Sequence, residues 1–316
     1  MRKFVIEIVV MLSLITVTIF LAYPKENHWR IRLLEKRKGK LNIINLGTSH
    51  GSDFSYDKSG LTGMHFNFPG NTLFYDLHNY LFIKENNYLV DNGVVVIPVS
   101  YFAFGLDENR TDGNVGEAFA NKFYDYLPSE HIYNYSVKKD VKLSIYKLQE
   151  AFDKVIQTKK EQKHVKKQKH IKNAPTQKPD RESIIKKLNQ HAKRRAKRHK
   201  MLSNFSSEAQ NMAYLERLLK EIKDANHQPV LVTTPYYNAY NKNFGKDWLN
   251  ENYFSKMHDL ATKYDVLYLD YSHDDRFTNK PGLYNNSDHL NEKGKQLFST
   301  IFLDDISLLL EKSKPE

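Results

Sequence analysis

A short turn after an apolar run carries a serine that could act as a nucleophile. Ser49 stands in the turn GTSHG at 47–51, directly after the apolar segment 41–47. Glycine neighbours permit the tight turn that exposes a hydroxyl, and the ends of parallel strands are where open α/β sheets bind ligands. The turn makes Ser49 a candidate nucleophile, although a plain strand-to-loop turn has the same composition.

The second segment that could do chemistry is NSDHLNEKG at 286–294, just before a predicted C-terminal helix. Serine attack needs a base that removes the hydroxyl proton, and His289 suits that role near neutral pH. A carboxylate would hold the imidazole tautomer. Asp288 is adjacent, and Asn286 could accept the Nδ1 proton through its amide oxygen. One histidine among 13 means little, so the hypothesis depends on its pairing with Ser49.

Together the two segments resemble the SGNH/GDSL hydrolase family. The Gly-Asp-Ser turn after the family's first strand is similar to 47–49, and its last block, Asp-x-x-His before the C-terminal helix, is similar to 286–289. The family's second block, which adds a glycine N–H to the oxyanion hole, is similar to NFPGN at 67–71. The resemblance covers about 41–110 and 205–312 and implies a Ser49 nucleophile with His289 as its base.

Within the catalytic blocks, two residues of this sequence differ from the family pattern. Thr48 replaces the family's aspartate, which is not the nucleophile, and Asn286 stands where the triad carboxylate belongs. Asp288 is one residue from His289, and a regular backbone does not easily turn an adjacent side chain back onto the ring. The predicted catalytic set is therefore Ser49 and His289 with Asn286 and Asp288 as alternative partners.

A third departure concerns the oxyanion and substrate groups. The family's Gly-x-Asn-Asp block is missing after the strand at 94–99, which leaves Ser100 as the candidate side-chain donor. The backbone N–H groups of Ser49 and Gly70 would then supply most of the stabilisation. Asn71 follows Gly70, and Tyr236, after another apolar strand, is expected to shape the acyl or sugar pocket.

Apolar patterning predicts the elements that position these residues. Buried strands are expected at 41–47, 93–100, 229–235 and 266–270, and helices at 72–85, 206–226, 252–264 and 291–312. Strands that alternate with helices predict an α/β fold with a parallel sheet covered on both faces. We expect a three-layer α/β/α sandwich with about five strands, and the resemblance implies a flavodoxin-like strand order.

The N-terminal region predicts a membrane anchor. After a tail at 1–3, residues 4–23 are apolar apart from Glu7 and a few hydroxyls, and about 20 such residues span a bilayer. A cleaved signal peptide is the alternative, but no small-residue cleavage pair follows. The basic stalk at 24–40 favours a cytoplasmic body by the positive-inside rule. The functional hypothesis favours a single-pass plasma-membrane protein with an extracellular body, and the two indications conflict.

The excess positive charge lies in one segment. Residues 159–200 hold 17 Lys and Arg against three acidic residues, whereas the whole chain has a net charge of +11. The predicted SGNH-like domain has a first part at 41–137 and a second at 204–316, separated by a basic, partly helical insertion at 138–203. A solvated face or binding to an anionic membrane or polymer explains the charge. Nucleic acid is least favoured, because no aromatic residue lies between 159 and 200.

Three hypotheses for the whole protein remain open. The first is a serine esterase or O-acyltransferase at the cell envelope, acting on a cell-surface polysaccharide or teichoic-acid-like polymer, with a membrane acyl-donor protein as a further partner. The second takes 47–51 as the G-x-S-x-G elbow of an α/β-hydrolase, with Asp270 as the acid. The third is an anchored, non-catalytic polyanion-binding protein with a degenerate site. The chain has no cysteine, which excludes disulfides and a thiolate nucleophile, and we expect no cofactor or metal.

Overall fold

The computed structural model describes residues 4, 6, 7, 10, 11, 13, 29–56, 59–108, 120–147, 149, 181–202 and 205–313. The chain divides into two compact units, each of which is described by itself. One consists of Met1–Ile31 and Ala120–Lys178, and the other of Arg32–Phe119 and Pro179–Glu316.

The larger unit is built on a five-stranded parallel sheet with the order β2-β1-β3-β4-β5. The strands are β1 (Leu41–Asn45), β2 (Gly63–His65), β3 (Leu89–Pro98), β4 (Gln228–Thr233) and β5 (Leu267–Asp270). This is the flavodoxin-like order. The predicted parallel sheet is therefore confirmed, with β2 as the one strand that no apolar run had located.

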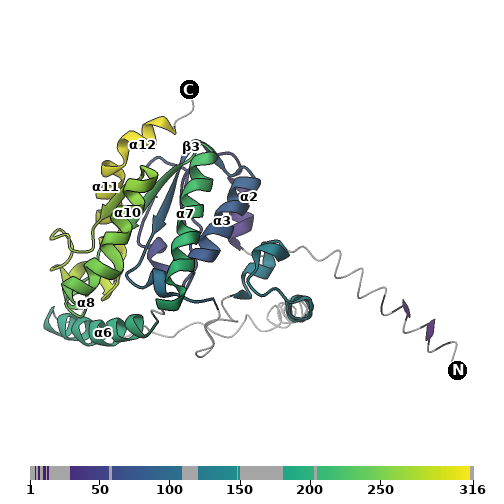
Figure 1. Ribbon diagram of the computed structural model, residues 1–316, viewed down its shortest axis with the longest axis horizontal. Coiled ribbons are helices and arrows are strands. Elements are labelled where there is room, and N and C mark those ends of the chain that lie inside the picture. Colours follow the sequence, from purple (N-terminus) through teal and green to yellow (C-terminus); the bar gives the residue numbers. More distant parts are fainter. Residues whose placement is uncertain are drawn as a thin grey trace, which may run out of the picture. The chain divides into compact units, whose positions relative to one another are not determined.

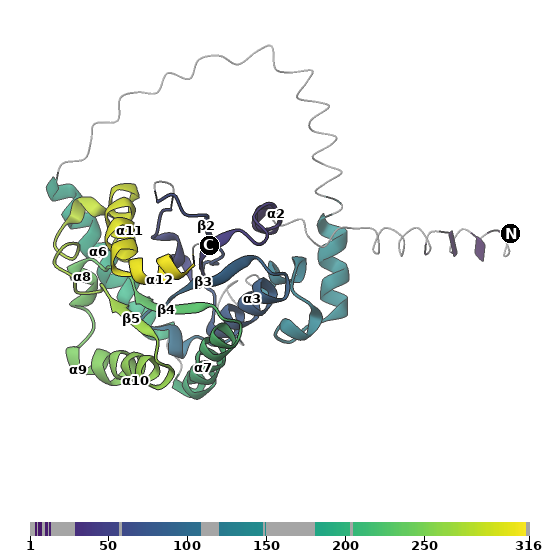
Figure 2. The same cartoon turned by 90° about the horizontal axis from the view of Figure 1, so that it is seen from above.

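Helices cover both faces of this sheet, as Figures 1 and 2 show. On one side lie α3 (Leu73–Glu85), α7 (Glu208–Asp224) and α10 (Ser255–Tyr264), and on the other lie α11 (Glu292–Asp305) and α12 (Ser307–Lys312). The short helices α8 (Asn238–Asn241) and α9 (Lys246–Leu249) follow β4. The arrangement is the predicted three-layer sandwich.

The core on the α11 side explains why the apolar runs form central strands. Val94, Val96 and Val230 are fully buried and share one cluster with Phe298 and Phe302 of α11. Successive side chains of a strand point to opposite faces, so a strand covered on both sides needs a continuous apolar run. That requirement is why β3 and β4 could be recognised from sequence.

Helix α6 (Arg181–Leu202) corrects the expectation of a solvated insertion. Leu188, Ala192 and Ala196 of this helix are at most 4% exposed, and Leu188 belongs to the same core cluster as α11. The docked face was missed because it is made of one leucine and two alanines rather than of large apolar residues. The part of the basic segment before residue 181 lies outside the described residues.

The region predicted as a basic stalk contains the helix α2 (Trp29–Lys36). Within the larger unit, Leu34 is fully buried and Glu35 accepts a hydrogen bond from the Tyr88 hydroxyl. The end of the stalk is therefore part of the folded unit.

The predicted anchor at 4–23 lies almost entirely outside the described residues, which include only six of its positions. Among the residues that the structure does describe, no helix has the length and apolar character needed to cross a membrane.

The described part of the smaller unit contains short 3-10 turns at Phe123–Asp125 and Ser129–His131, followed by a helix at 137–147. Lys147 forms an ion pair with Asp125, and the Tyr135 hydroxyl donates to Asp140 at 2.6 Å. Residues 120–137, predicted as part of the SGNH-like domain, belong to this unit.

Candidate active site

The turn after β1 is shaped by two glycines. Gly47 has a φ of +91°, and a Cβ there would lie 2.8 Å from the Pro98 carbonyl oxygen. A Cβ on Gly51 would lie 2.4 Å from Asn67 Cβ. Only glycine fits such close backbone approaches. The chain can therefore leave the strand and enter the 3-10 turn η1 (Ser49–Ser52), which begins at the candidate nucleophile.

His289 is brought to this turn by a small hairpin before α11. The hairpin pairs β6 (Tyr284–Asn286) with β7 (His289–Leu290), and Asn291 caps α11 by accepting from the Gly294 N–H at 3.0 Å. His289 Nε2 lies 3.1 Å from Ser49 Oγ, although the two residues are 240 positions apart. The predicted pairing of these two side chains is thus present in the structure.

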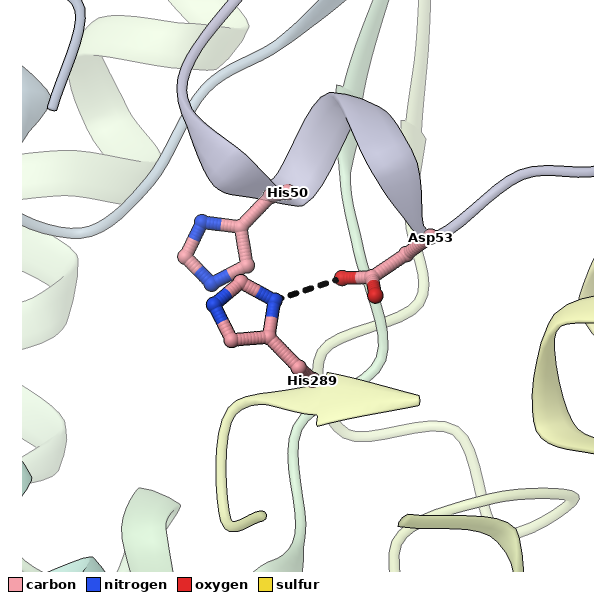
Figure 3. Close-up of side chains that lie close together, drawn as sticks. All are labelled: His50, Asp53 and His289. Carbon is pink, nitrogen blue, oxygen red and sulfur yellow. Dashed lines mark hydrogen bonds and ion pairs between the residues drawn. The ribbon is translucent and has the colours of Figure 1, made fainter. Parts of the chain in front are cut away.

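The partner of the other ring nitrogen is Asp53, which the sequence reasoning missed. His289 Nδ1 lies 3.3 Å from Asp53 Oδ2, and Oδ1 of the same carboxylate accepts from the Leu290 N–H at 3.2 Å. Figure 3 shows Asp53 reaching His289 from the end of the turn that carries His50. Asp53 caps the C-terminus of η1, four residues after Ser49.

The prediction that Asn286 orients His289 is wrong. Its amide oxygen accepts from the Asp288 N–H at 3.1 Å, as in an Asx turn, and holds the tip of the hairpin. Asp270, the acid of the α/β-hydrolase hypothesis, accepts from the Ser272 N–H at 2.9 Å and so caps its own loop.

The electrostatics of the site favour a charged imidazolium. Burial lowers the pKa of His289, but the carboxylates of Asp53 and Asp288 outweigh it and leave that pKa above its ordinary value of 6.5. In the neutral ring, the contact with Asp53 places the proton on Nδ1. Nε2 is then the acceptor for the Ser49 hydroxyl, the arrangement that a serine nucleophile needs.

Asp288, the other predicted partner of His289, lies on the Nε2 side of the imidazole ring. Its side chain is fully buried, and Oδ2 lies 2.8 Å from Arg195 Nε and 3.9 Å from His289 Nε2. Burial raises the pKa of Asp288, but the hydrogen bond from His50 and the charges of His289 and Arg195 outweigh it and leave that pKa well below its ordinary value. Asp288 is therefore a buried anion beside the base and does not contact Nδ1.

His50 forms the back wall of the site. Its ring stacks on His289 with centroids 4.5 Å apart, and its Nδ1 lies 2.8 Å from Ser100 Oγ. Burial, followed by the charge of His289, lowers the pKa of His50. The neutral ring fixes the orientation of His289 without adding a second positive charge.

Two predicted substrate residues instead support His50. Ser100 is fully buried and its hydroxyl is engaged with the His50 ring, so the prediction of Ser100 as the oxyanion donor is wrong. Tyr236 is 1% exposed and packs edge-on against His50 at 5.4 Å. Its predicted role in shaping an open pocket is replaced by one in the wall behind His50.

The segment predicted as the second oxyanion block braces the nucleophile turn. Asp76 Oδ1 accepts from the Gly47 N–H at 2.8 Å and also from the Asn71 side-chain amide. Asn71 is buried and engaged in this bridge. Gly70 lies in an exposed turn with a φ of +72°, and its role as a backbone oxyanion donor stays a prediction.

His50, Asp53 and His289 also place possible metal-ligand atoms within 4.8 Å of one another. The two rings, however, are stacked with only 25° between their planes. Lone pairs that lie in nearly parallel planes do not converge on one ion. His289 also uses both nitrogens for Ser49 and Asp53, so neither ring nitrogen is left to bind an ion.

A groove of about 900 Å³ lies elsewhere, lined by Ser55, Ser59 and Leu61 on one side and by the helices α11 and α12 on the other. Ser49, Asp53 and His289 are not among the residues that line it. The groove therefore carries no part of the site described above.

Comparison with known proteins gives a likeness in structure alone. No protein-family model matches the chain, and no curated protein matches it significantly. A solved structure from Bacteroides fragilis, described as a "putative acylhydrolase", is 11% identical, with a TM-score of 0.40 over 90% of this chain and 100% of its own. A GDSL-like lipase from Bacteroides thetaiotaomicron is 9% identical, with a TM-score of 0.36 over 87% and 90%.

Scores this low transfer no residue and no activity to this chain, and the roles above rest on its own geometry. Its strand order, its serine after β1 and its histidine before α11 are those that the resemblance implied. The chain has a three-layer α/β/α fold with the flavodoxin-like strand order that the SGNH/GDSL resemblance implied.

Proposed function

We propose that this protein is a serine esterase or O-acyltransferase that works through an acyl-enzyme on Ser49. The observation that carries the proposal is the continuous connection from Ser49 Oγ to His289 Nε2 at 3.1 Å and from His289 Nδ1 to Asp53 at 3.3 Å. A nucleophile bonded to a base, with the base bonded to a carboxylate, is the arrangement that acyl transfer uses in unrelated folds.

In the first half of the reaction, Ser49 Oγ attacks the ester carbonyl carbon while its proton passes to His289 Nε2. Asp53 stabilises the imidazolium that forms. The tetrahedral intermediate then expels the alcohol, which takes the proton back from Nε2. The acyl group stays on Ser49 as an ester.

In the second half, His289 Nε2 removes a proton from the acceptor as the acceptor attacks the acyl carbon. The bond between that carbon and Ser49 Oγ then breaks, the acylated acceptor leaves, and Oγ takes the proton back from Nε2. Water as the acceptor gives hydrolysis, and a sugar hydroxyl gives transfer. The two outcomes share every protein group and differ in whether water is excluded. We leave both within the proposal.

We further propose that the substrates are acyl esters of a cell-surface polysaccharide or teichoic-acid-like polymer. The support is the basic segment, whose described part presents seven exposed cations on α6: Lys186, Lys187, Lys193, Arg194, Lys197, Arg198 and Lys200. An apolar segment at 4–23 would hold the protein at the plasma membrane with its body outside, where a membrane acyl-donor protein could serve it.

The structure argues against the two other hypotheses, a non-catalytic binding protein and an α/β-hydrolase. Asn286 was the main sign of a degenerate site, but Asp53 supplies the carboxylate that Asn286 lacks. The α/β-hydrolase hypothesis needs Asp270 beside His289, whereas Asp270 caps the 271–272 turn. A nucleophile elbow also follows several strands, and Ser49 follows β1.

The test is labelling with a fluorophosphonate, which reacts with activated serines. The purified full-length protein should be labelled, and Ser49→Ala should lose both the label and hydrolysis of 4-nitrophenyl acetate. Ser52→Ala is the matched control, because Ser52 lies in the same turn but bonds Asn67. If Ser49→Ala is labelled as strongly as the natural protein, the nucleophile is another residue.

A further inference from the structure

Helix α6 turns a strip of polar side chains toward the active site. His191, Arg195 and His199 recur at intervals of four residues, so they share one side of the helix. His191 Nδ1 lies 2.9 Å from Ser287 Oγ, Arg195 Nε lies 2.8 Å from Asp288 Oδ2, and His199 Nδ1 lies 2.6 Å from the Tyr240 hydroxyl. Two of these contacts hold the hairpin tip that precedes His289.

Arg195 is the cation of this strip. Burial lowers the pKa values of His191 and His199, so both contact their partners as neutral rings. The Arg195 guanidinium, in contrast, stays charged and balances the buried carboxylate of Asp288. The base His289 is therefore flanked by a fixed cation as well as by two carboxylates.

Only part of the Arg195 donor capacity is used. Its bond to Asp288 is made by Nε, and among the described residues no hydrogen bond is recorded for the two terminal nitrogens. The side chain is 27% exposed, so solvent reaches it. Three links of 2.8, 3.9 and 3.1 Å join Arg195 Nε through Asp288 and His289 to Ser49 Oγ. Arg195 is therefore separated from the nucleophile by only two side chains, Asp288 and His289.

The charges nearby favour an anion at this position. Asp53 is engaged with His289, and Asp288 with Arg195. On the helix itself, the exposed cations include Arg194 and Arg198, while the one acidic residue, Glu182, lies more than three turns away. On α6, the charge around Arg195 is therefore positive.

From these observations we propose that Arg195 binds an anionic oxygen group of the substrate. The site would then take acyl esters whose alcohol carries a carboxylate or phosphate close to the ester oxygen. The terminal nitrogens of a guanidinium form a planar fork that matches both groups. This inference rests on the proposed function, because it names the substrate class of the same site.

The test compares matched acetyl esters with and without the anion. One pair is an acetylated methyl glucuronide and an acetylated methyl glucoside, and the other is 1-acetylglycerol 3-phosphate and 1-acetylglycerol. Acetate release by the full-length protein gives kcat/KM for each. We expect the anionic member of at least one pair to be preferred on the order of tenfold or more, the size of a charged hydrogen bond. The pair with the larger preference identifies carboxylate or phosphate.

Three variants separate recognition from support of the fold. Arg195→Gln should abolish the preference, mainly through a higher KM for the anionic ester. Arg195→Lys keeps a positive charge near Asp288 but loses the fork, so it should retain only part of the preference. Lys220→Gln is the control, because Lys220 is an exposed cation of α7, outside α6, and it should keep the natural ratio.

The ratio of kcat/KM for the anionic ester to kcat/KM for the neutral ester does not change when a substitution slows both reactions by the same factor. If Arg195→Gln slows the two members of each pair by the same factor, or if the natural protein shows no preference, Arg195 only positions Asp288 and the proposal is overturned. Inorganic phosphate should also inhibit hydrolysis of 4-nitrophenyl acetate competitively, and less so in Arg195→Gln. If the natural protein hydrolyses no ester and Ser49 takes no fluorophosphonate label, the proposed function fails and the inference falls with it.

Discussion

At the scale of single residues, His289 is held by groups that favour its charged form. Asp53 bonds Nδ1, Asp288 lies 3.9 Å from Nε2, and the neutral ring of His50 stacks on its face. The pKa of His289 is therefore raised, against the effect of burial. A base must be deprotonated to accept the serine proton, so kcat/KM should fall on acidification at a pH above the 6.5 of an ordinary histidine.

Replacing Asp53 by asparagine tests this arrangement. Asp53→Asn removes the largest charge that raises the His289 pKa and allows the wrong tautomer to form. We expect kcat to fall by roughly 10³–10⁴-fold, as when a triad carboxylate is lost. Because the pKa of His289 falls, the acidic limb of the kcat/KM profile should also move to lower pH. A pH–rate profile with 4-nitrophenyl acetate measures both effects.

Asn286→Asp is the matched comparison, since it places a carboxylate where the SGNH/GDSL family has one. In this chain residue 286 is paired with His289 in the hairpin, but its side-chain oxygen accepts from the Asp288 N–H, and no hydrogen bond of the described residues joins it to the His289 ring. The variant should therefore give no gain in the natural background and no rescue of Asp53→Asn. A clear rescue would show that residue 286 orients the base and that Asp53 does not.

At the scale of elements, the strands and helices with large apolar residues could be predicted from sequence. The second half of β3, from Val94, and β4 from Pro229 to Val232 are continuous apolar runs because both faces are covered. Helix α7 shows helical spacing because one face is buried. β2 has three residues and no pattern, so nothing in Gly63–His65 indicated a strand. The packing of α6 against the core was not predicted, because its buried face includes two alanines, Ala192 and Ala196. Such small side chains do not produce a clear apolar pattern in the sequence.

The candidate site was predicted in part for a related reason. Ser49 and His289 were found because their residue types and flanking glycines are distinctive. Asp53 was missed because its role depends on the path of the 3-10 turn, which returns a side chain four residues later to the same histidine. A carboxylate at that spacing after a turn serine is the signal that could have found it.

The turn itself can be tested through Gly51. A Cβ at this position would lie 2.5 Å from the Leu46 carbonyl oxygen as well as 2.4 Å from Asn67 Cβ, so Gly51→Ala must displace the turn. We expect a loss of roughly 1–3 kcal/mol in the free energy of unfolding, as for other overpacked sites. Fluorophosphonate labelling of Ser49 should fall much further, because a shift of the turn separates Ser49 from His289. Urea unfolding and labelling rates measure the two effects.

Gly282→Ala provides the control, since no atom lies within 4 Å of a Cβ built there and its φ is not positive. It should leave both stability and labelling close to those of the natural protein. Equal labelling of the Gly51 and Gly282 variants would mean that the turn tolerates displacement and does not set the Ser49–His289 distance.

At the scale of the whole molecule, the described part of the basic segment, helix α6, lies beside the site. Changing Lys186, Lys193 and Lys197 to glutamine should weaken binding of the full-length protein to polyglutamate while turnover of 4-nitrophenyl acetate stays within a few-fold. Binding by the natural protein should fall with added salt, because the Debye length is only about 8 Å at physiological ionic strength. Co-sedimentation over a range of salt concentrations measures this.

The control removes the same charge from elsewhere in the larger unit, with Lys220, Lys246 and Lys280 changed to glutamine. All three are exposed and lie outside α6. This triple variant should bind polyglutamate almost as the natural protein does. Equal weakening by both triple variants would assign the binding to net charge alone and would remove α6 as a specific surface.

The turn that holds both Ser49 and Asp53 has a consequence for the newly made chain. Nucleophile and carboxylate leave the ribosome together, whereas the base follows 240 residues later, a delay of tens of seconds at ~5–20 residues per second. During that interval the serine is no better a nucleophile than any surface hydroxyl. If the proposed function holds, an unfinished chain therefore takes up no acyl group. Truncated chains that end before residue 289 should stay unlabelled by fluorophosphonate, even where the turn has formed.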